Sequence, residues 1–315
     1  MAETAPANAI FQQPWWLDAV APGRWGQAIV EREGRTVARL PYAVRGRSRW
    51  RMLTQPPLTG TLGPWVERSG AKPANALAEE MELLTALEAA LPPAEAFLQH
   101  FSPTMLNALP FFWAGYRIEA RYTYRLEDLR SEDALWDGLR GNVRREIRKA
   151  RKRVEIRDDV GLDLFHSVWA KTFARQGLEP PHSLARLDRL HAACAQRDAS
   201  AMLFAQDEED RIHAVTYVVW DEHAAYYLLG GSDPELRTSG AASLLMWEAI
   251  MRARRVTGTF DFEGSMIQPV ERFFRAFGSR QAPYLRVSRA TAAGRAALTA
   301  RAVWHTMIRE VNRAR

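Results

Sequence analysis

The chain has 315 residues, of which 47% are hydrophobic and 25% are charged, and its formal net charge is +6. These shares are normal for packed domains and exclude a chain that is disordered throughout. At ~100 to 200 residues per domain, the length predicts two domains.

Membrane-spanning, secreted and metal-dependent classes have no support in the sequence. The longest uncharged stretch, 96–116, contains Pro103 and Pro110 and several polar side chains, which would leave polar groups unsatisfied in a bilayer. Residues 1–10 have neither the basic nor the apolar region of a secretory signal. The single cysteine, Cys194, excludes an internal disulfide and a thiolate-rich zinc site, and the histidines show no ligand spacing. We expect a soluble, cytoplasmic protein with no membrane span and no metal.

The first part of the chain alternates between strand-like and helix-like segments. Apolar alternation predicts strands, a 3.6-residue period predicts helices, and clustered proline and glycine predict loops. In chain order the predicted elements are a short helix over 13–20, strands over 27–31 and 37–42, a loop over 55–65, a helix over 73–91, and strands over 96–101 and 116–126.

A helix with one apolar face is predicted next. Its apolar residues recur at every fourth position, a spacing that places them on one side of a helix. They are Leu135, Leu139, Val143 and Ile147.

The other face of this helix is strongly basic. The segment 140–153 has eight basic residues against one acid. Such faces are commonly only solvated, but arginine also matches the geometry of phosphate groups. Arg144 and Arg148 are therefore predicted to contact an anionic substrate, such as a nucleotide phosphate, an acyl-CoA or a tRNA. No groove-reading motif accompanies them, so we expect no DNA partner.

The rest of the chain predicts a meander of strands between helices. In chain order the predicted elements are helices over 164–175 and 184–196, strands over 201–206, 211–220 and 224–229, a helix over 243–254, a strand over 258–262, a helix over 270–277 and a strand over 283–288. This order predicts an α/β fold of the layered α+β kind.

A loop rich in small residues, Gly230 to Ser243, joins a predicted strand to a predicted helix. Small residues let the backbone approach a ligand, and a helix N-terminus offers N–H groups to an anion. The alternative is a plain connecting loop. The predicted donor-binding residues are Arg237, Gly240, Ala242 and Ser243.

The same loop resembles a known signature. Arg237-x-x-Gly240-x-Ala242 is similar to the pyrophosphate-binding Arg/Gln-x-x-Gly-x-Gly/Ala signature of the GNAT acyltransferases. The segments 260–266 and 271–278 resemble the Fem-type branch, which includes proteins related to peptidoglycan-bridge aminoacyltransferases. The resemblance implies two tandem GNAT-like domains, which we place at 1–128 and 129–315.

Amide formation needs a group that deprotonates the amine and groups that stabilise the carbonyl oxygen and the leaving group. Asp261 and Glu263 alternate with phenylalanines on a predicted strand, so both are expected on one face, as catalytic residues. The alternative is that they cap a helix or pair with arginines.

The resemblance implies two further site residues. Arg275 stands where Fem-type enzymes usually have the lysine of a Phe-Lys-x-x-Phe pattern, so it is predicted to be catalytic, although arginine is a departure. Many GNAT enzymes use a tyrosine as acid in the last helix, where this chain has Phe273 and Phe274, which look like core. Tyr227 is among the tyrosines that would substitute, and we predict that it contacts substrate.

The sequence and the resemblance together predict an enzyme of the GNAT type, an acyl- or aminoacyltransferase that forms an amide on an amine acceptor. The donor co-substrate would be acyl-CoA or aminoacyl-tRNA, with no bound cofactor. The acceptor would be a small molecule, a peptide or a cell-wall precursor. Two alternatives stay open: a non-catalytic GNAT-like protein that binds an anionic ligand, and a nucleic-acid-binding protein that uses its basic helix.

Overall fold

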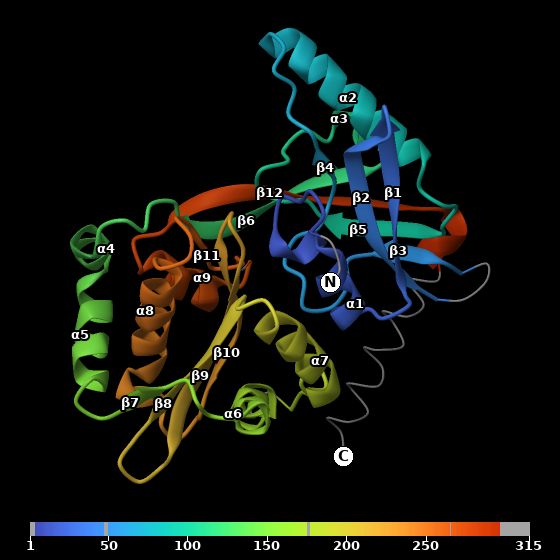
Figure 1. Cartoon of the computed structure of the whole chain (residues 1–315). Helices are drawn as coiled ribbons and strands as arrows, with labels where there is room; N and C mark the ends of the chain where they lie inside the picture. Colours follow the sequence, from blue (N-terminus) through green and yellow to red (C-terminus); the bar gives the residue numbers. More distant parts are fainter. Residues whose placement is uncertain (1–3, 47–49, 175–176, 265, 297–315) are drawn as a thin grey trace. The chain divides into compact units, whose positions relative to one another are not determined.

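The computed structural model describes residues 4–46, 50–174, 177–264 and 266–296 (Figure 1). The chain divides into two compact units, and each is built from two segments. The first unit comprises 1–20 and 121–283, and the second comprises 21–120 and 284–315. This division differs from the continuous domains 1–128 and 129–315. The N-terminal segment joins the first unit because its side chains pack on that unit, as Phe11 does against Tyr226 at 4.8 Å between ring centroids.

The first unit contains a mixed sheet in the order β6-β11-β10-β9-β8-β7. All pairings within it are antiparallel except β10 with β11, which run parallel. The strands are β6 (Arg117–Leu126), β7 (Glu155–Arg157), β8 (Ser200–Gln206), β9 (Ile212–Trp220), β10 (Ala225–Ser232) and β11 (Phe260–Asp261). The layered α/β arrangement predicted from the sequence is therefore confirmed.

Helices cover both faces of this sheet (Figure 1). Helix α8 packs on β8, β9 and β10 with α5 outside it, whereas α6 packs on β9 and β10 from the other side, beside α7. The helical elements of this unit are η1 (Ile10–Gln12), α1 (Pro14–Val20), α4 (Glu132–Gly138), α5 (Gly141–Ala150), α6 (Leu162–Ala174), α7 (Leu184–Ala195), η2 (Arg237–Ser239), α8 (Ala241–Ala253) and α9 (Gln268–Arg275).

The single basic helix predicted around 135–152 is wrong, because the structure has two helices there. Helix α4 ends at Gly138, and the next two residues are extended before α5 begins. The break lets the Arg140 N–H donate to the Ala276 carbonyl at 2.9 Å and lets Gly138 pack against Gly278. The apolar stripe survives the break. Its four residues, Leu135, Leu139, Val143 and Ile147, are all buried in the core of the first unit.

The second unit has a sheet in the order β1-β2-β3-β5-β12, and β4 also pairs with β2. Its core contains Phe97, Phe101 and Phe111. Its elements are β1 (Trp25–Arg32), β2 (Arg35–Arg45), β3 (Met52–Thr54), β4 (Trp65–Val66), α2 (Pro73–Ala89), β5 (Ala96–His100), α3 (Leu109–Trp113) and β12 (Arg280–Ala290), of which β12 begins within the first unit. In the part of the chain that the structure describes, every helix is too short or too polar to cross a bilayer.

Candidate active site

Strands β10 and β11 are paired only over two residues. Ala225 lies opposite Phe260, and Tyr226 lies opposite Asp261. Beyond Tyr226, β10 continues to Ser232 paired with β9 alone among the described strands, and its register shifts between Tyr227 and Leu229. The two parallel strands therefore separate at Tyr226, and one edge of β10 is left without a strand partner.

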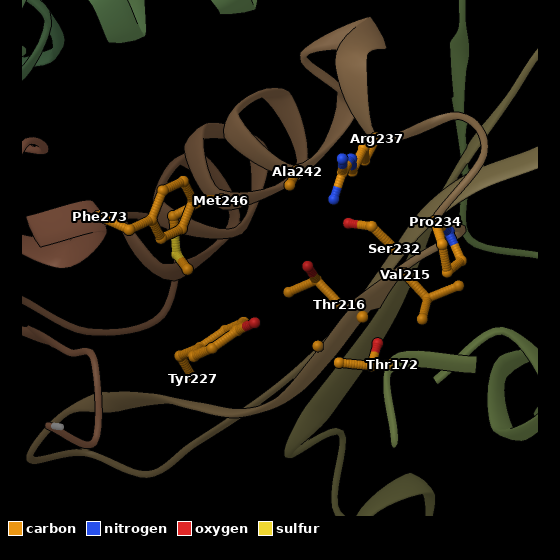
Figure 2. A pocket seen from close by; sticks show the side chains of 12 residues that line it. Thr172, Val215, Thr216, Tyr227, Ser232, Pro234, Arg237, Ala242, Met246 and Phe273 are labelled. Carbon is orange, nitrogen blue, oxygen red and sulfur yellow. The ribbon is translucent and has the colours of Figure 1, made fainter. Parts of the chain in front are cut away.

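A pocket of about 250 Å³ lies against this part of β10 (Figure 2). Strands β9 and β10 form its floor, and α6, η2, α8 and α9 contribute its walls. The lining residues are Thr172, Val215, Thr216, Tyr227, Gly230, Gly231, Ser232, Pro234, Arg237, Ala242, Met246 and Phe273. The predicted residues Arg237, Ala242 and Tyr227 are thus brought together in one pocket.

The pocket has a polar, cationic end. Figure 2 shows the Arg237 guanidinium directed toward Ser232, near Ala242 at the start of α8. Arg237 is exposed and forms no ion pair with any described residue. At the start of α8 the Ala241 N–H donates to Ser239 Oγ and the Ser243 N–H to the Gly240 carbonyl, which leaves the Ala242 N–H as a donor at this end. A helix N-terminus and a guanidinium together favour an anion.

Two glycines let the strand backbone form the pocket floor. A Cβ atom at Gly230 would lie 1.9 Å from the Tyr227 hydroxyl, and one at Gly231 would lie 2.9 Å from the Trp169 Cα atom. Only glycine therefore fits at Gly230 while the Tyr227 hydroxyl stays where it is.

The opposite end of the pocket is apolar, where Tyr227, Met246 and Phe273 gather (Figure 2). The Tyr227 ring packs edge-on against Phe274 at 5.8 Å between centroids, so its orientation is fixed. Burial raises the pKa of Tyr227 to about 12. The hydroxyl is therefore protonated at neutral pH and can donate a hydrogen bond.

Gly240 and Ser243, predicted to bind the donor, do not line this pocket. Gly240 has a φ of +85°, and a Cβ atom there would lie 2.4 Å from the Glu146 carbonyl oxygen on α5. The close approach that requires glycine is therefore the packing of α5 against the start of α8. Ser243 is buried within α8.

The acid pair is arranged differently from the prediction. We expected Asp261 and Glu263 on one strand face, which is wrong because β11 ends at Asp261 and Glu263 has a φ of +61°. Asp261 is buried, where it accepts hydrogen bonds from the Thr123 hydroxyl at 2.5 Å and the Glu263 N–H at 2.8 Å. Its carboxylate lies 3.5 Å from Arg125 Nε.

Glu263 lacks such partners. No described residue hydrogen-bonds or pairs with its half-buried carboxylate. Burial, and then the nearby Asp261, raise the pKa of Glu263 well above its ordinary value. Because Arg125 and Thr123 stabilise the charge on Asp261, we assign the charge of the pair to Asp261 and the proton to Glu263.

The remaining predicted site residues lie outside the pocket. Arg275 pairs with Glu271 at 2.8 Å, and Glu271 also accepts from the Tyr124 hydroxyl at 2.8 Å. Arg144 lies 3.7 Å from Asp137, and the Arg148 guanidinium lies over the Trp136 ring at 5.6 Å from its centroid. In the described residues, no group of three or more His, Cys, Asp or Glu side chains forms a metal site.

Part of the pocket was not predicted from the sequence. Phe273 looked like core but is half-buried and lines the cavity, whereas Phe274 is buried behind Tyr227. Met246 and Thr172 lie on α8 and α6. No local sequence pattern indicates that these helices contact β10. A usable signal was the pair Gly230-Gly231 within an otherwise apolar strand, which marks a close backbone approach.

Comparisons with known proteins give a family for part of the chain and similar folds for most of it. Residues 138–275 match the acetyltransferase (GNAT) domain family, and no curated protein matches the chain. FemX has a similar fold, with a TM-score of 0.65 at 13% identity over 88% of this chain and 91% of its own. The C-terminal domain (DUF2156) of a putative lysylphosphatidylglycerol synthetase from Agrobacterium fabrum has a TM-score of 0.53 at 16% identity, covering 87% of each chain.

A tandem GNAT protein from the clavulanic acid biosynthesis pathway is also similar, with a TM-score of 0.52 at 12% identity over 86% of this chain and 84% of its own. The predicted resemblance to the Fem-type, tandem-GNAT architecture is thus confirmed at the level of the fold. Residues 138–275 therefore match a GNAT acetyltransferase domain, within a chain whose fold is similar to that of FemX and a tandem GNAT protein.

Proposed function

We propose that this protein moves an acyl group from an acyl-CoA to an amine. The observation that supports this most directly is the pocket along the unpartnered edge of β10, which has the cation Arg237 at one end and an apolar wall at the other. An acyl-CoA has the matching polarity, because its phosphates are anionic and its acyl group is apolar. The acceptor would be an amine of a small molecule, a peptide or a cell-wall precursor.

The composition of the pocket favours acyl-CoA over aminoacyl-tRNA as donor. Its lining contains one cation and no carboxylate. An aminoacyl group has an ammonium ion that would enter the apolar end of this pocket without an anionic partner, which is costly in a partly buried site. A neutral acyl group avoids that cost.

Two groups at the point where β10 and β11 separate fit the chemistry of amide formation. Tyr227 follows the last paired residue of β10, and Glu263 lies two residues beyond the last paired residue of β11. In its deprotonated form, Glu263 would accept a proton from the acceptor ammonium, whose free amine then bonds to the acyl carbon. The carbon–sulfur bond breaks, and the departing sulfur takes up the second proton that the nitrogen loses, while the Tyr227 hydroxyl would donate a hydrogen bond to that sulfur. The products are an amide and free CoA.

Removing the cation of the pocket tests donor binding. Arg237→Ala is expected to weaken the binding of acetyl-CoA by ~10- to 100-fold, the usual size of one or two charge-assisted hydrogen bonds. Isothermal titration calorimetry measures this directly. Arg255→Ala is the matched control, because Arg255 is exposed just beyond α8 and does not line the pocket. Equal affinity in the two variants would remove Arg237 from the site.

Removing the Tyr227 hydroxyl tests its role as a donor. Tyr227→Phe keeps the ring packed on Phe274, so we expect unchanged acetyl-CoA affinity and a turnover ~10²- to 10³-fold lower, as for other lost transition-state donors. Steady-state kinetics with a panel of amines measures the change. Tyr122→Phe, which alters an exposed tyrosine outside the pocket, is the control. Normal turnover in Tyr227→Phe contradicts the assignment.

One observation favours an aminoacyl-tRNA donor as a second candidate. Around α5, Arg140, Arg145, Lys152 and Arg153 form no ion pair with any described residue, and all four are exposed. A thermal-shift comparison separates the candidates: stabilisation by acetyl-CoA supports the first, and stabilisation by tRNA with no response to CoA supports the second. Binding of CoA without turnover on any amine would indicate a non-catalytic binding protein instead.

A further inference from the structure

The apolar end of the pocket has walls of unequal rigidity. Tyr227 is held on one side by Phe274 and on another by the backbone at Gly230, where no Cβ atom would fit beside its hydroxyl. Met246 and Phe273 close the same end from α8 and α9 (Figure 2). Tyr227 therefore cannot withdraw to admit a larger group, and the space beyond it depends on the two other side chains.

These two side chains lie in different surroundings. Met246 is 1% exposed and stands on the inner face of α8. Phe273 is half-buried on α9, with its ring 5.2 Å from that of Phe277. Both fill volume without offering a polar group. An acyl chain that extends past Tyr227 would collide with these two side chains.

We infer that Met246 and Phe273 limit the length of the acyl chain, so that the enzyme transfers short acyl groups and rejects long ones. The inference rests on the proposed function, because it takes acyl-CoA as the donor in this pocket. It follows from the polarity of the cavity: the phosphates stay with Arg237 and the Ala242 N–H, which directs the acyl end toward Tyr227, Met246 and Phe273. Each methylene of an acyl chain that fits the space raises the affinity of the CoA ester by about fourfold. An acyl chain too large for the space lowers that affinity.

Binding of a series of CoA esters tests this without any need for turnover. Calorimetry with acetyl-, butyryl-, hexanoyl- and octanoyl-CoA is expected to show for the wild type an affinity that is highest for a short ester and falls at least ~10-fold for octanoyl-CoA. Met246→Ala and Phe273→Ala should move the optimum to a longer chain. Each should bind octanoyl-CoA at least ~10-fold more tightly than the wild type does, while binding of free CoA stays the same.

Met251→Ala is the matched control, because it makes the same change on the same helix at a residue outside the pocket. It should keep the wild-type profile. Where an alanine variant does not fold, Phe273→Leu gives a smaller opening and should still shift the optimum in the same direction.

The outcomes separate the inference from the proposed function. If neither free CoA nor any ester binds, the proposed donor is wrong. If CoA binds but the wild type accepts all chain lengths equally, or if both variants keep the wild-type profile, the proposed donor stands and the length limit is overturned.

Discussion

Glu263→Gln is expected to lower turnover by ~10²- to 10⁴-fold, because the amine acceptor is an ammonium ion at neutral pH and the variant has no base to deprotonate it. Glutamine has nearly the size of glutamate, and the Glu263 N–H to Asp261 hydrogen bond involves only the backbone of residue 263, so the fold should be preserved. Binding of acetyl-CoA should not change, because Glu263 does not line the donor pocket. Single-turnover kinetics with saturating donor measures the effect.

The pH profile gives this prediction a second readout. Burial and the nearby Asp261 hold the pKa of Glu263 well above its ordinary value. Only the deprotonated form acts as a base, so wild-type turnover should rise with pH through that raised pKa, and Glu263→Gln should lose this rise.

Stability should depend on pH in the opposite direction. A carboxyl with a raised pKa holds in the folded state a proton that the unfolded chain releases. Its stabilising contribution is fully present below the ordinary carboxyl pKa of 4.5 and is lost as pH rises through the raised value. Since glutamine does not titrate, Glu263→Gln should become more stable than the wild type as pH rises. Thermal unfolding across the same pH range measures this.

Glu248→Gln is the control for both readouts. Glu248 lies on α8, pairs with Arg151 at 3.4 Å and does not line the pocket. It should keep wild-type turnover and the wild-type pH profile. If Glu263→Gln retains full turnover and an unchanged profile, Glu263 is not the base, and its raised pKa reflects only its burial beside Asp261.

Several features of the fold could be predicted because they depend on local periodicity. The four-residue spacing from Leu135 to Ile147 identified a buried face correctly even though the helix is broken within it. The alternating segments around β8, β9 and β10 gave the antiparallel meander. The strand-to-helix loop that contains Arg237 was placed correctly, because small residues and a following apolar helix mark such a loop in any sequence.

Other features depend on contacts between distant segments, which periodicity does not encode. Period-2 alternation places Asp261 and Glu263 on one face only where the strand continues past Asp261, but β11 has only two residues. Thr123, on the neighbouring strand β6, donates a hydrogen bond to the buried Asp261 carboxylate. The N-terminal segment joins the first unit through packing such as that of Phe11 on Tyr226, which has no signal in either segment alone.

Gly240 illustrates the same limit. Its place in the Arg-x-x-Gly-x-Ala pattern predicted a glycine that lets a donor approach. The structure shows instead a glycine against which α5 packs, with the Glu146 carbonyl where a Cβ atom would stand. Helix packing can therefore require the residue at one position of a motif, while its neighbours, here Arg237 and Ala242, line the pocket.

Gly240→Ala is consequently expected to destabilise the fold rather than to act on donor binding alone. A non-glycine residue at a φ of +85° costs ~1 to 2 kcal/mol, and the new Cβ atom would lie 2.4 Å from a backbone oxygen, so α5 and α8 must separate. Together we expect a loss of about 3 kcal/mol or more, which for a domain of this size lowers Tm by about 6 to 12 °C. Scanning calorimetry measures the change.

Gly258→Ala provides the control for this substitution. Gly258 precedes β11, is exposed, lacks a positive φ and has nothing within 4 Å of the position that its Cβ atom would take, so its Tm should match the wild type within about 2 °C. Comparing the Tm values of the two variants distinguishes a glycine required for helix packing from a glycine required for the approach of the donor. If Gly240→Ala instead melts like the wild type and loses acetyl-CoA affinity, the glycine serves the donor. The polar end of the donor pocket would then include the whole loop from Arg237 to Ala242.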